Sequence, residues 1–120
     1  NLGKELVIDS KIKAEEISWE MLDKINEFNH YGEGNPPPMF LLEGIKIKII
    51  DKVGSTQDHL KIKGEKDSKI FDVIGFGLGN RFSEFKIGDM IDIVFELTLN
   101  EWNGSKLLQL KMQDLKKTKP

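Results

Sequence analysis

The dipeptide Asn103-Gly104 lies between two segments of alternating apolar and polar residues, and it constrains the fold more than any other feature of the sequence. Both central residues of a two-residue hairpin turn need positive φ, and asparagine followed by glycine adopts it most readily. A turn at this site places Trp102 opposite Ser105 and so sets the pairing of strands at 90–100 and 106–115. The sequence therefore predicts a hairpin with a single register.

This register aligns side chains of the same kind on each face of the hairpin. One face carries apolar pairs: Leu99 with Leu108, Leu97 with Leu110, and Phe95 with Met112. The other face carries polar pairs and opposite charges: Thr98 with Gln109, Glu96 with Lys111 and, at the tip, Glu101 with Lys106. A slip of one residue would move every side chain of one strand to the opposite face. The pattern on both faces supports the same alignment.

The register also places Trp102 on the polar face, with Thr98 and Asn100, and away from the face of Phe95. Two interpretations of this outward tryptophan stay open. Its indole ring can stack on a nucleic-acid base, an interaction of about 1–3 kcal/mol that every base can make. Alternatively, the ring lies over Leu107 or the N-terminal helix and covers an apolar patch, because aromatic side chains in hairpins often pack on their neighbours.

Further strands are expected at residues 5–12, 44–50, 59–63 and 69–77. In the second of these segments, alternation places Ile45, Ile47 and Ile49 on one face, directed inward, and lysines on the other. The segment 69–77 is apolar on both faces, which indicates a strand covered on both sides. The stretch 80–85 is long enough for only a turn or two of helix.

The N-terminal part of the chain contains one expected helix, over residues 19–29, with Ser18 as its N-cap. Its apolar stripe consists of Met21, Leu22, Ile25 and Phe28, together with Ile17 before the cap. Glycines and three prolines in residues 32–38 then form a stiff connector. We therefore divide the chain into an N-terminal segment and connector (1–38), a barrel domain (39–116) and a basic tail (117–120).

The five strands expected after the connector, with a short helical piece between the third and the fourth of them, predict a mainly β protein, a small closed barrel of the OB type. In that fold, oligonucleotides or oligosaccharides bind the outer face of the second and third strands, beside the loops that join strands one to two and four to five. His59, Lys61 and Lys63 are expected on this face, and Trp102 lies in the loop between strands four and five.

The composition limits the possible classes of protein. The net charge is −2, from 18 basic and 20 acidic residues, which is unlike a strongly basic, autonomous nucleic-acid binder. There is no cysteine, so we expect a reducing cytoplasm, and no apolar run approaches the ~20 residues of a membrane span. The chain opens at Asn1 without a signal-peptide pattern, so we expect a segment of a longer protein.

Several stretches resemble one family, the RecJ single-strand-specific DNA exonucleases. Residues 30–40, HYGEGNPPPMF, resemble the connector of that family, and residues 100–104, NEWNG, followed by LQLKMQD at 108–114, resemble its OB domain. The stretches HLKIK at 59–63 and IGFG at 74–77 also resemble that OB domain, and all these stretches follow the same order as in the family. Tyr31 stands where the family often has phenylalanine, and Asn29-His30 replaces a commoner Glu-Pro pair. The resemblance covers nearly the whole chain.

The resemblance implies a single-stranded-DNA-binding OB module of a 5′-to-3′ exonuclease that acts in DNA repair and recombination. The family's catalytic motifs, an Asp-His-His sequence and further metal-binding residues, belong to preceding domains and are absent here. We therefore expect no catalysis and no cofactor in this part, with Mg²⁺ or Mn²⁺ in the parent enzyme. Expected partners are single-stranded DNA, the catalytic domains and a single-strand-binding protein.

The candidate DNA-binding residues are Lys46, Lys48, His59, Lys61, Lys63, Phe71, Arg81, Trp102 and Lys106. The lysines can follow a phosphate backbone, although alternating lysines also keep a strand edge soluble. Arg81 can clamp a phosphate or pair with Glu84. His59 is either a ligand contact or a hydrogen-bonding surface residue, and Phe71 is expected to contact bases.

A second interpretation of the whole chain is a protein-interaction or scaffolding domain whose outer face docks the catalytic core or single-strand-binding protein. It accounts for the two-sided apolar strand and for the acidic N-terminal region. A third interpretation, oligosaccharide binding, has little support, because the chain has only ten aromatic residues (seven Phe, two Trp, one Tyr) and most are expected in the core.

Overall fold

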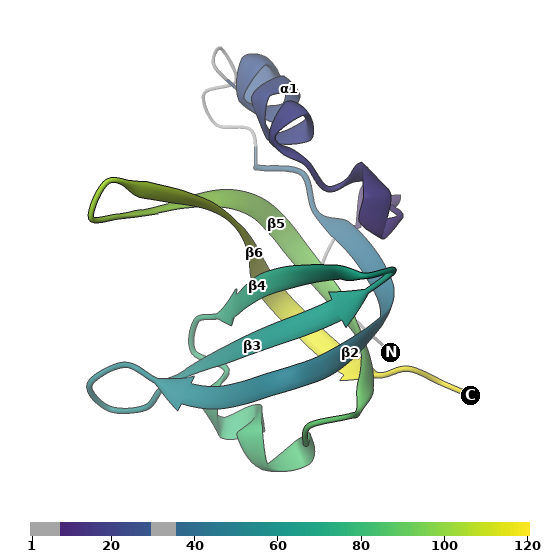
Figure 1. Ribbon diagram of the computed structural model, residues 1–120, viewed down its shortest axis with the longest axis vertical. Helices are drawn as coiled ribbons and strands as arrows, with labels where there is room; N and C mark the ends of the chain where they lie inside the picture. Colours follow the sequence, from purple (N-terminus) through teal and green to yellow (C-terminus); the bar gives the residue numbers. More distant parts are fainter. Residues whose placement is uncertain (1–7, 30–35) are drawn as a thin grey trace.

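The computed structural model describes residues 8–29 and 36–120 (Figure 1). The strands are β1 (Ser10–Lys11), β2 (Phe40–Val53), β3 (His59–Lys66), β4 (Lys69–Gly75), β5 (Met90–Trp102) and β6 (Ser105–Lys117). One α-helix, α1 (Trp19–Asn29), and two 3₁₀ helices, η1 (Ala14–Glu16) and η2 (Gly79–Glu84), complete the described elements. Residues 5–7 of the expected first strand and residues 32–35 of the connector lie outside the described part.

The long strands close into a barrel. β2 pairs with β3 along its second half and with β5 along its first half, both antiparallel. The parallel pairing of β4 with β6 joins the two halves, so the strand order is β2-β3-β4-β6-β5 and returns to β2. β1 adds a short parallel strand at Phe40 and Leu41 of β2. The expected five-stranded OB barrel with η2 between its third and fourth strands is confirmed.

The final hairpin has the predicted register. Trp102 pairs with Ser105, and the ladder continues without a shift to the pair of Phe95 and Met112. Asn103 and Gly104 have φ of 50° and 80°, as the turn requires. Both strands are longer than expected, because β5 reaches the turn and β6 extends to Lys117.

The expected inward position of Ile49 is wrong. β2 changes register between Ile47 and Ile49, so two residues of β2 lie opposite one position of β3. Ile45 and Ile47 are fully buried and Ile50 takes the next inward position, whereas Ile49 is 48% exposed. A second register shift, against β5, lies between Leu42 and Ile45. β2 begins at Phe40, earlier than the expected residue 44, and it continues through Gly44.

The N-terminal segment shares the hydrophobic core of the barrel. Its buried members are Ile12, Ala14, Ile17 and Leu22. The strand expected over 5–12 is reduced to β1 in the described residues, because the chain turns into η1 after Lys13. The helix has its predicted bounds, and the Ser18 hydroxyl accepts a hydrogen bond from the Met21 amide at 3.1 Å, as an N-cap does.

Lysine 69 attaches this segment to the start of β4. Its ammonium group donates to the carbonyl oxygens of Ala14, at 3.3 Å, and Ile17, at 2.8 Å. Figure 1 shows α1 at the top, on the side of the barrel where β2 begins. In the described ranges, no helix combines the length and the apolar character needed to cross a membrane.

Candidate nucleic-acid interface

Alternation along β3, β4 and β6 brings one set of side chains to the outer side of the barrel. Leu60, Ile62 and Val73 are buried inside, so their neighbours in sequence point outward. The outward cross-strand pairs are Lys61 with Ile74, Lys63 with Asp72, Asp72 with Gln109, and Ile74 with Lys111. Ile74 is only 7% exposed, so neighbouring side chains cover it. We call the surface formed by Lys61, Lys63, Asp72, Phe76, Gln109 and Lys111 the outer face.

Phe76 is the aromatic residue of this face, and it was not among the residues predicted from the sequence. Its side chain is 56% exposed. The ring meets the His59 ring edge to face, with centroids 5.2 Å apart, and the Lys111 ammonium lies 6.0 Å from the Phe76 centroid. The alternation along this segment could have identified Phe76, because inward side chains at Phe71 and Val73 imply an outward side chain at Phe76. An exposed ring beside a cation is the combination that binds stacked bases.

The structure exposes Trp102, whose side chain is 72% accessible at the hairpin tip. This exposure favours the stacking interpretation over the packing interpretation for this residue. No cross-strand neighbour can cover it, because Ser105 lies opposite and the next outward residue, Leu107, is itself 51% exposed. Figure 1 shows the hairpin tip and the β2–β3 loop projecting on the same side of the barrel, at the left. The outer face lies on the strands between these two loops.

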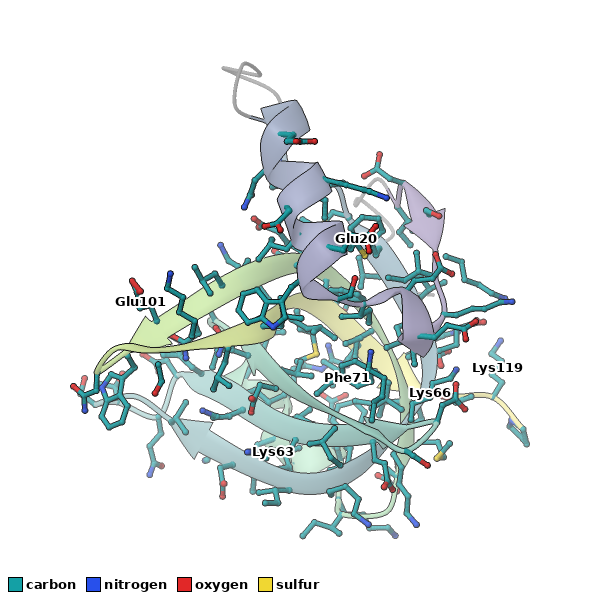
Figure 2. The ribbon with its side chains drawn as sticks, turned by 45° about the horizontal axis from the view of Figure 1, so that its top comes forward. Glu20, Lys63, Lys66, Phe71, Glu101 and Lys119 are labelled. Carbon is teal, nitrogen blue, oxygen red and sulfur yellow. The ribbon has the colours of Figure 1, made fainter. Side chains whose placement is uncertain are left out.

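Phe71 is not available for base contact. Its side chain is only 5% exposed, because odd-numbered positions of β4 face the core. Figure 2 shows Phe71 within the fold, among the strands. The expected contact of Phe71 with bases is therefore wrong in this structure, and Phe76 takes the role of the outward aromatic residue at the end of the same strand.

The guanidinium of Arg81 is held by contacts within the protein. Its guanidinium donates to the Glu84 carboxylate at 2.5 Å, to Asp114 at 3.2 Å and to the Leu115 carbonyl oxygen at 3.1 Å. The hydrogen bond to Glu84 is the main reason that the pKa of Arg81 is raised above its ordinary value. These contacts favour the pairing interpretation over a phosphate clamp, because each of the three guanidinium nitrogens already donates to a protein oxygen.

The lysines predicted from the sequence, and Lys111 of the outer face, differ in their surroundings. Lys63 lies 3.6 Å from Asp72, and three other pairs are 3.9 Å apart: Lys48 with Glu65, Lys106 with Glu101, and Lys111 with Glu96. Such exposed pairs contribute little and are easily exchanged for other partners. Among the described residues, Lys61 forms no ion pair with a carboxylate. Lys61 is thus the cation of the outer face that is most available to a phosphate.

Lys46 and Lys48 lie away from the β2–β3 loop and from the hairpin tip. Lys46 pairs across the ladder with Glu65, at the end of β3 farthest from His59. Figure 2 shows Lys66, the next residue, on the opposite side of the molecule from Glu101 at the hairpin tip. The structure therefore brings His59, Lys61 and Lys63 together and places Trp102 and Lys106 on the hairpin, whereas Lys46 and Lys48 lie toward the β3–β4 turn.

His59 is a hydrogen-bonding residue at the strand end, one of the two alternatives open for it. Its Nδ1 accepts a hydrogen bond from the Gly77 amide at 3.0 Å.

Within the described residues, no group of three or more histidine, aspartate or glutamate side chains is arranged to hold a metal ion. The outer face, together with the neighbouring His59, offers an exposed aromatic ring, cations and hydrogen-bonding groups.

The closed five-stranded barrel, with a helical piece between its third and fourth strands and exposed aromatic residues on its outer face and hairpin tip, defines a domain of the OB class. More narrowly, the chain belongs to the family of the RecJ OB domain, whose family model matches residues 8–114.

Relatives of known sequence agree with this assignment. The single-stranded-DNA-specific exonuclease RecJ of Bacillus subtilis is 31% identical over 107 residues, which are 89% of this chain and 14% of that protein. The corresponding protein of Haemophilus influenzae is 26% identical over 106 residues, 85% of this chain and 18% of that protein. The chain thus spans less than a fifth of the length of either relative.

Solved structures show the same fold. RecJ of Thermus thermophilus in complex with Mg²⁺ superposes with a TM-score of 0.57 at 24% identity, over 84% of this chain and 15% of that chain. The second single-stranded-DNA-binding protein of Mycobacterium smegmatis superposes with a TM-score of 0.55 at 19% identity, over 66% of this chain and 84% of that chain.

Proposed function

We propose that this domain binds single-stranded DNA on its outer face, as a module of a RecJ-like 5′-to-3′ exonuclease that acts in DNA repair and recombination. The observation that carries the proposal is the exposed Phe76 ring beside Lys111, with Lys61 on the neighbouring strand of the same sheet face, between the two projecting loops. Two relatives named as single-stranded-DNA-specific exonucleases and a structural neighbour named as a single-stranded-DNA-binding protein support it.

In this proposal, bases stack on Phe76 and on Trp102, while the lysines of the outer face contact phosphates. Stacking does not require a particular base, so the binding is independent of sequence. Each lysine that replaces a condensed counterion makes the affinity depend on salt. Lys106 contacts the strand near the hairpin tip, and Lys46 and Lys48 contact a longer strand that continues toward the β3–β4 turn.

The isolated domain is expected to bind weakly. Most lysines of the interface also face a carboxylate, and the net charge of the chain is −2. We propose a dissociation constant in the micromolar range or weaker. Linkage to the catalytic domains of a longer chain raises the effective concentration of this module at the DNA, so the intact enzyme binds more tightly.

Hydrolysis belongs to the rest of the proposed enzyme. A two-metal centre for phosphodiester cleavage needs a cluster of carboxylate and histidine ligands, and the described residues contain none. We propose that the catalytic domains hold Mg²⁺ or Mn²⁺ and that the protein acts in the cytoplasm. The contribution of this domain is to hold the strand that the catalytic domains cut.

Titration with fluorescein-labelled oligo-dT tests the proposal. Anisotropy is measured at about 50 mM and about 200 mM salt, with a duplex of equal length as the control. We expect saturable binding of the single strand, weaker at the higher salt concentration and weaker still for the duplex. Failure to bind at low salt, or binding that salt does not change, contradicts the proposal.

A second candidate function is supported by an apolar surface that adjoins the outer face at Asp72 and includes Lys106 of the hairpin. Trp19, Ile70 and Leu107 are 44%, 56% and 51% exposed and line one pocket of about 430 Å³ between the N-terminal segment, β4 and β6. Such a surface suits a protein partner, and the proposed partners are the catalytic core or single-strand-binding protein. Ile70→Ser, which adds no charge beside Asp72 and Lys106, should then weaken binding to the purified partner while oligo-dT affinity stays unchanged.

A further inference from the structure

The direction of the Phe76 ring is not determined by its own strand. β4 ends at Gly75, and Phe76 lies between that residue and Gly77, which has φ of 75°. Gly77 lies outside the ladder in a conformation that other residues rarely adopt, so strand pairing does not restrain the backbone after Phe76. Without contacts from elsewhere, the ring would sample several directions above the sheet.

Besides the Lys111 ammonium of β6, the contacts that hold Phe76 come from the start of β3. The β3–β4 ladder ends at the pair of Leu60 and Gly75, so His59 and Phe76 lie just beyond it. The His59 Nδ1 accepts the Gly77 amide hydrogen at 3.0 Å, and its ring meets Phe76 at an interplanar angle of 78°. One side chain thus holds the backbone after Phe76 and contacts the Phe76 ring itself.

His59 is itself held by the β2–β3 loop. Gly54 lies against the imidazole so closely that an added Cβ would be 2.9 Å from the His59 Cδ2. The carbonyl oxygen of Asp58 accepts a hydrogen bond from the Gly79 amide at 2.8 Å, which joins the loop to the start of η2. The loop, the imidazole and the end of β4 therefore form one connected unit.

We propose that His59 is a positioning residue: through its Nδ1 it holds Phe76 in the orientation that stacks on a DNA base. This inference rests on the proposed function of the outer face. Accepting at Nδ1 requires that the neutral imidazole carry its proton on Nε2. His59 therefore acts mainly through Gly77 and Phe76, and a preset ring avoids the ordering that a mobile ring would need on binding.

Three variants separate the acceptor from the ring. His59→Phe keeps an aromatic ring beside Phe76 but removes the acceptor. His59→Asn removes the ring but places an amide oxygen near the former position of Nδ1. Thr118→Val is the matched control: it removes a neutral hydroxyl that donates to Asp92 at 2.6 Å, outside the outer face. Each variant is assayed for oligo-dT affinity, thermal unfolding and amide hydrogen exchange at Gly77.

We expect His59→Phe to weaken oligo-dT binding roughly three- to tenfold, because the variant loses one hydrogen bond. Amide hydrogen exchange at Gly77 should become faster. His59→Asn should recover most of the affinity and of the protection. Thr118→Val should lower the unfolding temperature without altering either property.

Equal affinity and equal Gly77 exchange in His59→Phe and in the unmodified domain overturn the inference. So does a His59→Asn domain that binds as poorly as His59→Phe. If the unmodified domain does not bind oligo-dT, the DNA-binding proposal fails. In that case the Gly77 exchange rates and the NMR line shapes of the Phe76 ring still show whether His59 holds this segment.

Discussion

Lys111 and Phe76 meet on the outer face with the ammonium 6.0 Å from the ring centroid, although the two residues lie far apart in the chain. Lys111 comes from β6 and Phe76 follows the end of β4, and these strands meet only through the short parallel ladder that closes the barrel. Closure of the barrel therefore creates the pairing of a ring and a cation on which the proposed interface depends.

Phe76→Ala should reduce oligo-dT affinity by about 1–3 kcal/mol, because it removes a stacking surface. The free energy of unfolding should change by only about 0.5 kcal/mol, since the ring is 56% exposed. Anisotropy titration and urea unfolding measure the two quantities. Ile87→Ala, which truncates a 66% exposed side chain in the turn before β5, is the control and should leave the affinity unchanged.

Trp102→Ala should also weaken oligo-dT binding without lowering the melting temperature by more than a few degrees, because the indole is 72% exposed. In a Trp19→Phe background, Trp102 is the single tryptophan of the chain. Iodide should then quench its fluorescence strongly in the free protein and less in the presence of oligo-dT. A large drop in melting temperature with retained DNA binding would instead indicate that the indole packs on the protein.

Lys61→Gln and Lys111→Gln should each reduce the slope of log affinity against log salt by about 1, since each removes one phosphate contact. Both glutamines keep a similar side-chain length. Lys86→Gln, which changes a lysine in the turn after η2, serves as the control for net charge. An equal change in slope for all three variants would argue against a localised contact.

Arg81→Gln should lower the free energy of unfolding by about 1–3 kcal/mol, because the variant loses charge-assisted hydrogen bonds to Glu84 and Asp114. These bonds, with the one to the Leu115 carbonyl oxygen, connect η2 to β6. Oligo-dT affinity should stay the same. A loss of affinity at unchanged stability, measured by anisotropy and urea unfolding, would restore Arg81 as a phosphate contact.

Gly79→Ala should destabilise the β2–β3 loop. An added Cβ would overlap the Gln57 carbonyl oxygen and lie 2.7 Å from the Asp58 carbonyl carbon, and backbone atoms cannot move aside as a flexible side chain would. We expect a loss of about 1–3 kcal/mol in urea unfolding and faster amide exchange in residues 54–58. Gly77→Ala, with open space around its Cβ but φ of 75°, separates steric overlap from backbone strain.

Elements determined by near neighbours in the sequence were predictable. The hairpin register followed from Asn103-Gly104 and from two matching faces, and every predicted pair is present. The helix followed from its apolar stripe and from the Ser18 cap, and it has the predicted bounds. In both, the interacting residues are close in the chain, so the pattern contains the necessary information.

Errors arose where the alternation along a strand was interrupted or was not used. The shift after Ile47 turned Ile49 outward, since a bulge inserts one residue and reverses parity beyond it. Phe71 was selected in place of Phe76, although the inward Val73 between them implies that the even-numbered positions lie on the outer side. The pairing of Arg81 with Glu84, three residues away, was one of the alternatives predicted. The exposure of Trp102 and the contacts of Arg81 with Asp114 and Leu115 depend on segments far away in the chain.

Alternation and turn chemistry were therefore sufficient for the class of fold, the final hairpin and the helix, because local geometry dictates them. The composition of the outer face depended on long-range packing. β2 had to bend at two bulges, and β4 had to meet β6, before His59, Phe76 and Lys111 could lie together. Contacts between distant strands follow from how the barrel closes, and no short pattern in the chain specifies them.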